Sequence, residues 1–482
     1  MTNNSAGLRA QLLRRKPVAQ LMAEAGPHEG GLKRALGALD LTALGIGAIV
    51  GAGIFVLTGV AAARYAGPAI VLSFTVAGFA CAMAALCYAE FAAMIPVAGS
   101  AYSYSYATMG ELMGWIIGWD LVLEYAVAAA AVAVGWSGYL RVILDGLGLH
   151  LPDALTHAPG SMPGAITDLP ALLIVLLVSA ILYLGISESA RFNSAIVAIK
   201  LFVIGLVIVV GAFYVRPANW SPFAPMGWSG VMKGGAVIFF AYIGFDAVST
   251  AAEEVIDPKR DLPLGILGSL AICTVLYIAV AAVLTGMVPA AHIDVNAPLA
   301  SAFVIRGLYA ISGIVSFGAV AGLTSVLLVL LLGQSRIFYA MSRDGLLPPA
   351  FSRVHPRFRT PYIPTTLTGF AVGIAAALLP IQEIAELTNI GTLFAFVLVC
   401  IGVWILRHLE PEMHRPFKTP LVPLVPILGV LFCAYLMASL PALTWMRFVI
   451  WLAIGLAIYF SYGRRHSRVA ARAEELLRAT AS

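Results

Sequence analysis

Charged residues are scarce in this sequence. Only 11% of its 482 residues are Asp, Glu, Lys or Arg, whereas 61% are hydrophobic. Ordinary soluble domains carry about 25% charged residues. A chain with so few charges cannot cover a normal water-facing surface, so much of it must face lipid. The composition therefore argues against a soluble protein and favours an integral membrane protein.

Several chemical signatures are also missing. No HExxH or GxSxG pattern occurs, and the eight histidines are scattered among loops and tails, so we predict no enzyme, no metal site and no cofactor. The first 35 residues lack an apolar segment, so no cleavable signal peptide is expected. An odd number of cysteines inside apolar runs predicts no disulfide framework; they are Cys81, Cys87, Cys273, Cys400 and Cys433.

Twelve apolar runs are long enough to cross a bilayer, for which a helix needs roughly 20 residues. They occupy residues 41–64, 68–95, 100–143, 169–187, 193–215, 231–252, 263–288, 301–341, 363–380, 385–407, 421–440 and 444–462. The third and eighth runs exceed the length of an upright span and predict strong tilt. The predicted fold class is an all-α polytopic membrane protein with 12 transmembrane helices.

Lys and Arg are distributed unevenly around these runs. Of the 29, 22 fall in the two tails and the even-numbered loops, six fall on the other side, and Lys200 lies inside a run. Cytoplasmic segments carry the excess of positive charge, so both termini are predicted to be cytoplasmic. The net charge of +5 then reflects membrane topology, and no nucleic-acid partner is predicted.

The chain divides into two similar halves. Glycines interrupt the first run at Gly45, Gly47, Gly51 and Gly53, and Gly244 interrupts the sixth. Five runs per half would place the second half in the inverted orientation, an arrangement typical of transporters. We therefore predict a cytoplasmic segment at 1–40, a first inverted repeat at 41–215, a second at 231–407, two further spans within 421–462 and a cytoplasmic tail at 463–482.

Four glycines within nine residues weaken the first helix enough to predict a break, although close helix packing is an alternative role for them. A broken helix exposes N–H groups that suit an anion and carbonyls that suit a cation. An α-amino acid presents both charges. We predict that its carboxylate binds N–H groups near Gly51, Ala52 and Gly53. Its ammonium is predicted to meet the carbonyls of Ile49, Phe240, Ala241 and Ile243.

Together these motifs resemble the amino acid–polyamine–cation superfamily, and most closely its cationic amino acid transporter branch. The matching segments extend over nearly the whole chain and comprise Gly45–Phe55, Phe239–Ala247, Glu253-Glu254 with Asp257-Pro258, Arg343–Pro348 and Thr360-Pro361. The resemblance implies a LeuT-like fold, which consists of two inverted five-helix repeats and two additional peripheral helices. It also implies amino acid transport by alternating access.

Lys200 is the candidate for ion coupling. It lies in an apolar run, where an ammonium loses the hydration that stabilises its charge. In sodium-coupled relatives a cation sits between the first, fifth and eighth spans, and the Lys200 ammonium could occupy that place. We predict proton-coupled symport, with an exchanger, a sodium symporter or an amino acid sensor as the alternatives.

Side-chain selectivity is harder to predict. Asp120 and Glu124 lie four residues apart on one helical face, so Glu124 could reach a substrate cavity. By family analogy Leu330 lines the side-chain pocket and favours small or aliphatic substrates, whereas a basic substrate would need Glu124. Asp246 is expected to cap the helix that resumes after the second break. The predicted partners are an amino acid, protons and the lipid of the cell inner (plasma) membrane.

Overall fold

The structure is a computed structural model, and it describes residues 12–17, 36–96, 100–185, 190–358 and 360–469. These residues are helical throughout, apart from turns, loops and two isolated β-bridges. In this part of the chain, eight helical segments are long and apolar enough to cross a membrane, and four shorter apolar helices accompany them. The chain is therefore a polytopic, all-helical membrane protein, as its composition predicted.

The helices follow the predicted apolar runs closely. The first half contains α3 (Ala38–Ile49), α4 (Thr58–Ala61), α5 (Ile70–Met94), α6 (Ser100–Thr108), α7 (Glu111–Gly146), α8 (Leu169–Leu184) and α9 (Ala190–Ala212). The second contains α10 (Gly227–Ile238), α11 (Ala247–Thr250), α12 (Pro258–Met287), α13 (Pro298–Ile305), α14 (Tyr309–Arg343), α15 (Tyr362–Leu378) and α16 (Ile381–Leu409). The chain continues with α17 (Leu424–Ala438), α18 (Ala442–Ile458) and α19 (Arg464–His466).

The two overlong apolar runs are each divided into a short and a long helix. α6 and α7 are separated at Gly110, whose φ of +99° favours glycine. α13 and α14 are separated by a turn at Gly307, with φ of +74°. Tilt alone therefore does not account for the length of these runs. Hydropathy did not predict the divisions because a glycine turn leaves an apolar run uninterrupted.

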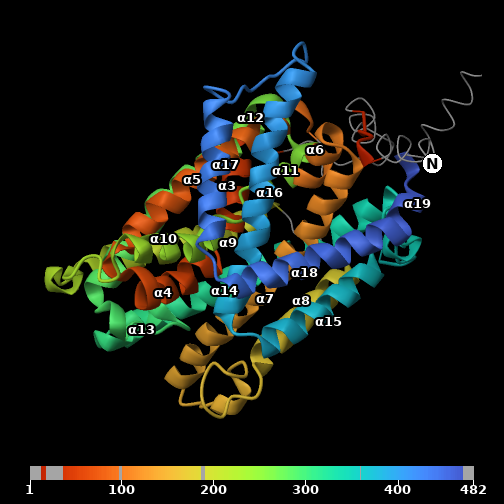
Figure 1. The fold of residues 1–482 in the computed structure, drawn as a ribbon. Coiled ribbons are helices and arrows are strands. Elements are labelled where there is room, and N and C mark those ends of the chain that lie inside the picture. Colours follow the sequence, from red (N-terminus) through yellow and green to blue (C-terminus); the bar gives the residue numbers. More distant parts are fainter. Residues whose placement is uncertain (1–11, 18–35, 97–99, 186–189, 359, 470–482) are drawn as a thin grey trace, which may run out of the picture.

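Two long helices, α7 and α14, pack along each other at the centre of the molecule. α3 packs against α12 and α9, and α9 also contacts α14. α16 packs against α7 and α17, while α8 and α15 lie side by side at the periphery (Figure 1). This arrangement encloses the α3 segment between helices of both halves.

The two ends of the molecule differ. Residues 12–17 and α19 lie at one end, which we call the terminal face (Figure 1). The loop that follows α7, residues 147–168, lies at the other end, which we call the opposite face (Figure 1). Long-range contacts agree with this placement, because Lys16 Nζ and the N–H of Arg468 both bond to Asp344, at the end of α14.

Candidate functional site

The first apolar segment is interrupted where its glycines predicted. α3 ends at Ile49, Val50 turns to an extended conformation with ψ of 92°, and a π-helical turn, η1, begins at Gly53. No carbonyl in the described part of the chain accepts a hydrogen bond from the N–H groups of Gly51, Ala52 or Gly53. The predicted break is confirmed, and it leaves three main-chain donors available.

The sixth segment is interrupted as well. α10 ends at Ile238 and is followed by the 3-10 turn η6 (Phe239–Tyr242). Ile243 is extended, with ψ of 136°, and Gly244 has a φ of +116°. The carbonyl of Phe240 accepts the N–H of Ile243. The second predicted break is therefore also confirmed.

The two interruptions touch each other through glycines. A Cβ atom on Gly53 would lie 2.2 Å from the Cα of Ala241, and one on Gly244 would lie 2.9 Å from the carbonyl carbon of Ala48. No real side chain tolerates contacts this short, so both positions require glycine for close approach. The breaks thus place the main chains of the two halves in direct contact.

A small central cavity lies at this contact, with a volume of about 30 Å³. It has room for about two water molecules. Eight of the nine predicted substrate-binding residues line it: Ile49, Gly51, Ala52, Gly53, Glu124, Phe240, Ile243 and Leu330. The ninth, Ala241, does not line the cavity, because its Cα packs against Gly53.

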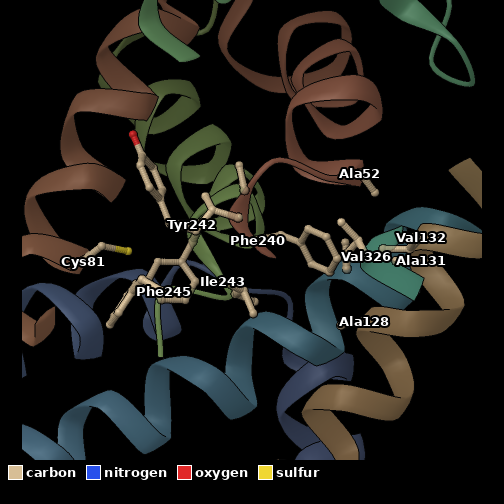
Figure 2. Close-up of a cluster of buried hydrophobic side chains, with 14 of the residues drawn as sticks. Ala52, Cys81, Ala128, Ala131, Val132, Phe240, Tyr242, Ile243, Phe245 and Val326 are labelled. Atoms are coloured by element: carbon tan, nitrogen blue, oxygen red, sulfur yellow. The ribbon is translucent and has the colours of Figure 1, made fainter. Parts of the chain in front are cut away.

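Side chains that the sequence did not single out complete the wall. Tyr125, Ala128 and Val132 come from α7, and Val326 and Val329 come from α14. The Phe240 ring points toward Val326 and the α7 side chains (Figure 2). Most of the lining is therefore aliphatic, and Phe240 and Tyr125 are its large aromatic groups.

Two carboxyl groups also face the central cavity, Glu124 of α7 and Asp246 beside the second break. Asp246 occupies the N-cap position of α11, but its side chain makes no capping hydrogen bond in the described structure; its Oδ2 accepts a hydrogen bond from the Tyr125 hydroxyl at 3.4 Å. Asp120 lies one turn from Glu124 but outside the cavity, against Gly391 of α16. Among the described residues, neither oxygen of Asp120 has a hydrogen-bond partner.

Lys200 of α9 is completely buried and contacts the first interrupted segment. Its Nζ donates a hydrogen bond to the carbonyl of Gly47 at 2.6 Å, in the last turn of α3. A Cβ on Gly322 of α14 would lie 3.1 Å from the Lys200 side chain, so a glycine at this position leaves room for the lysine. The ammonium thus lies between α3, α9 and α14.

The terminal face is closed by polar contacts. Asp344 accepts from Lys16 Nζ at 3.0 Å and from the Tyr102 hydroxyl at 2.6 Å. A cavity of about 100 Å³ lies on this side of the central cavity and shares Tyr125, Ala247 and Val329 with it.

Glu90 and Glu254 form contacts that are separate from those of Asp344. Glu90 lies away from Asp344 and pairs with Arg407 at 2.7 Å and Arg415 at 3.4 Å. The carbonyl of Glu254 accepts the N–H of Leu36.

Toward the opposite face the central cavity is closed by aromatic packing. The Tyr139 hydroxyl donates to the Phe55 carbonyl at 2.6 Å, and the two rings meet edge to face. A chamber of about 700 Å³ lies on this side and shares no lining residue with the central cavity. The central cavity and this chamber are therefore separate cavities.

The sequence comparisons agree with this architecture. The family model described as amino acid permease matches residues 36–459. A methylthioribose transporter of Bacillus subtilis is 52% identical, covering 95% of this chain and 99% of that protein. The branched-chain amino acid permease BcaP of the same organism is 51% identical, covering 96% and 100%.

A vacuolar cationic amino acid transporter 4 of Arabidopsis thaliana is 39% identical, covering 83% of this chain and 68% of that protein. These relatives are transporters, so the prediction that the chain is not an enzyme is confirmed. The chain belongs to the amino acid permease family, within the amino acid–polyamine–cation superfamily.

Proposed function

We propose that this protein is a proton-coupled symporter of amino acids that works by alternating access. The proposal includes the LeuT-like arrangement of 12 spans in two inverted repeats, with the terminal face in the cytoplasm. The observation that carries it is the contact between two interrupted helices beside a central cavity that is separate from the chamber on the opposite face. Unpaired main-chain groups at such a contact can hold a substrate while either side opens.

The main-chain groups suit the two charged ends of an α-amino acid. The N–H groups of Gly51, Ala52 and Gly53 would receive the carboxylate, since no protein acceptor in the described residues engages them. In the described part of the chain the Ile243 carbonyl accepts no backbone hydrogen bond and would receive the ammonium; Ala241 does not line the cavity, so its carbonyl is not assigned this role. The Ile49 carbonyl already accepts the Tyr277 hydroxyl at 2.9 Å, so it is a weaker ammonium ligand than we expected from sequence.

Aliphatic walls favour a small or branched aliphatic side chain. Val132, Val326 and Leu330 offer no polar group to a substrate. Relatives named for branched-chain and for cationic amino acids both fit the amino acid class. A basic side chain would need Glu124 or Asp246, which makes cationic substrates the second candidate.

The relative named for methylthioribose suggests a test of main-chain recognition. Methylthioribose carries neither an ammonium nor a carboxylate, so it could not use both ends of the site. We expect it to compete poorly with leucine for binding. Competition as strong as that of leucine itself would favour a sugar thioether as the substrate and contradict the zwitterion site.

Lys200 would couple transport to protons. When charged, its ammonium holds the Gly47 carbonyl and with it the end of α3. When neutral, it loses most of the electrostatic attraction to that carbonyl, so α3 can move relative to α9 and α14. Proton release and movement of α3 would then occur together.

The test is uptake of labelled leucine and arginine into proteoliposomes in sodium-free buffer, with and without an inward proton gradient. We expect accumulation with wild-type protein under the gradient and its loss in Lys200→Met, while binding in detergent persists. Sodium-dependent uptake that is unaffected in Lys200→Ala would contradict proton coupling. Uptake that requires internal amino acid would indicate an exchanger, and binding without any flux would indicate a sensor.

A further inference from the structure

The chamber on the opposite face is lined by arginines from three elements. Arg64 follows α4, Arg141 lies on α7 and Arg447 lies on α18. Further walls come from the 147–168 loop, the first turns of α16, the start of α18, and Val295 and Asn296 before α13. The chamber is large enough, at about 700 Å³, for an amino acid with water around it. It is therefore a second polar cavity on a route to the central one.

Two of these arginines have neutral partners. Arg64 donates to the side-chain oxygen of Gln382, and Arg141 contacts the ring of His157. No carboxylate among the described residues forms a salt bridge with either guanidinium. Arg447 differs, because its Nη2 pairs with Glu383 at 2.6 Å. Arg64 and Arg141 thus bring positive charge into the chamber that no nearby ion pair cancels.

Of the neighbouring titratable groups, Glu383 pairs with Arg447. His157 and Asp168 form no ion pair with Arg141 in the described structure. Burial lowers the pKa of His157, so this ring is neutral near pH 7. Burial raises the pKa of Asp168 to about 7, and its Oδ1 is engaged by Ser137 and by the N–H of Ala171. The charged or titratable groups lining the chamber are Arg64, Arg141, Arg447, His157, Asp168, Glu383 and Glu386.

A single glutamine connects the basic and acidic parts of the chamber. The Gln382 oxygen accepts from Arg64, and its nitrogen donates to Glu386 at 3.1 Å. Glu386 is only 6% exposed and also accepts from Thr444 at 3.0 Å. The Arg64 guanidinium and the Glu386 carboxylate therefore lie on the two sides of the Gln382 side-chain amide. Their opposite charges suit the carboxylate and the ammonium of an amino acid.

We propose that this chamber is a second, lower-affinity amino acid site, in which Arg64 and Arg141 bind the substrate carboxylate and Glu386 binds its ammonium. The proposal rests on the proposed function, because it assigns the same substrate class to a separate site. Guanidinium groups bind carboxylates by paired, charge-assisted hydrogen bonds. A substrate held here would be positioned to enter when the Phe55–Tyr139 contact opens.

The test separates the two sites by substitution. Gly51→Val fills the central cavity, because a Cβ there already lies 3.4 Å from Val326. Equilibrium binding of labelled leucine and arginine would be measured on purified wild type and on Gly51→Val. It would also be measured on the double variant Arg64→Gln/Arg141→Gln, alone and combined with Gly51→Val. Arg216→Gln is the control, since Arg216 is an exposed arginine that does not line the chamber. Gel filtration checks that each variant is folded.

We expect two binding sites per wild-type chain and one in Gly51→Val, with the remaining affinity in the millimolar range. Combining Arg64→Gln and Arg141→Gln with Gly51→Val should weaken this remaining binding by tenfold or more, as expected for lost hydrogen bonds to a charged group. Isopentylamine, which resembles leucine without the carboxylate, should not displace leucine from Gly51→Val.

The proposal of a second site is overturned if folded Gly51→Val binds neither amino acid. It is also overturned if the further substitutions Arg64→Gln and Arg141→Gln leave the binding of Gly51→Val unchanged. Displacement by isopentylamine would also overturn it. Failure of the proposed function looks different, because wild-type protein would then drive no amino acid flux into proteoliposomes, whatever Gly51→Val binds.

Discussion

Gly51 and Gly53 lie two positions apart in the first interruption, but their surroundings differ. A Cβ on Gly53 would overlap the main chain of Ala241, whereas one on Gly51 would reach only the Val326 side chain at 3.4 Å. Valine at Gly51 should abolish binding at the central cavity and leave the protein folded. Valine at Gly53 should also destabilise the fold, because the two interrupted segments would have to separate at Ala241.

Alanine substitutions at these two positions should therefore give different results. Gly53→Ala should lower the apparent melting temperature and reduce transport at least tenfold, since overpacking of this kind costs about 1–3 kcal/mol. Gly51→Ala should melt within a few degrees of wild type and keep its leucine affinity within about threefold. Thermal unfolding in detergent and equilibrium binding measure both effects. Equal melting temperatures for the two variants would contradict the role given to Ala241.

Main-chain groups of the central cavity were more predictable than its side chains. Closely spaced glycines in an apolar run signal a break, and the positions of the unpaired N–H groups follow from it. Tyr125, Val326 and Val329 gave no such signal, because apolar and aromatic residues are equally common on lipid-facing and buried surfaces of these helices. Only the packing of α7 against α14 determines which of them face the cavity.

Among the helices, apolar length predicted where the chain is helical but not where it turns. The run at 100–143 contains a turn at Gly110, where a Cβ would lie 2.7 Å from the backbone of Leu13. That contact involves a residue about a hundred positions away, so the local sequence could not reveal it. A single glycine within an apolar run is tolerated in a helix, and its spacing alone does not indicate a turn.

The start of α8 gives the protein a pH-dependent element. Asp168 is the N-cap of this helix, and burial raises the pKa of its carboxyl from 3.8 to about 7. A raised pKa means that the folded state favours the protonated acid. This contribution to stability is fully present below pH 3.8 and declines as the pH rises through about 7.

Asp168→Asn should accordingly remove part of the pH dependence of stability. Asparagine is also a good N-cap, so α8 should remain intact. We expect the difference in melting temperature between pH 5 and pH 8 to be smaller in the variant than in wild type, measured by thermal unfolding in detergent. Asp153→Asn, an exposed acid of the same loop, serves as the control and should behave like wild type. An unchanged difference in Asp168→Asn would contradict the assignment.

Across the protein, the barriers on the two sides of the central cavity are built differently. Toward the opposite face the barrier is aromatic packing between Phe55 and Tyr139. Toward the terminal face, a cavity that shares three lining residues with the central one is closed by the contacts of Asp344 with Lys16 and Tyr102. The terminal side therefore depends on a charge and should respond to its removal.

Asp344→Asn should shift the protein toward conformations open at the terminal face. The substitution removes the charge that Lys16 and Tyr102 contact, and hydrogen bonds to charged groups contribute about 1.5–3 kcal/mol each. We expect a cysteine introduced at Ala340, which lines the terminal-side cavity, to react with a maleimide about tenfold faster in this background. The five native cysteines are buried and should contribute little background.

Glu383→Gln provides the matched control, because it removes an ion pair on the opposite face. It should leave the maleimide reaction at residue 340 unchanged. Equal acceleration by both substitutions would indicate general loosening and contradict a specific gate at Asp344.

The contacts around Asp344 join parts of the chain that lie about 450 residues apart in the sequence, Lys16 and Arg468. Lys16 bonds to its carboxylate, the N–H of Arg468 bonds to its carbonyl at 3.0 Å, and the backbone of His466 packs against Gly345. These contacts therefore cannot all form until residue 468 has been synthesised, after the last long helix, α18. A copy shortened between α18 and residue 468 would keep all of its long helices but lack one wall of the barrier.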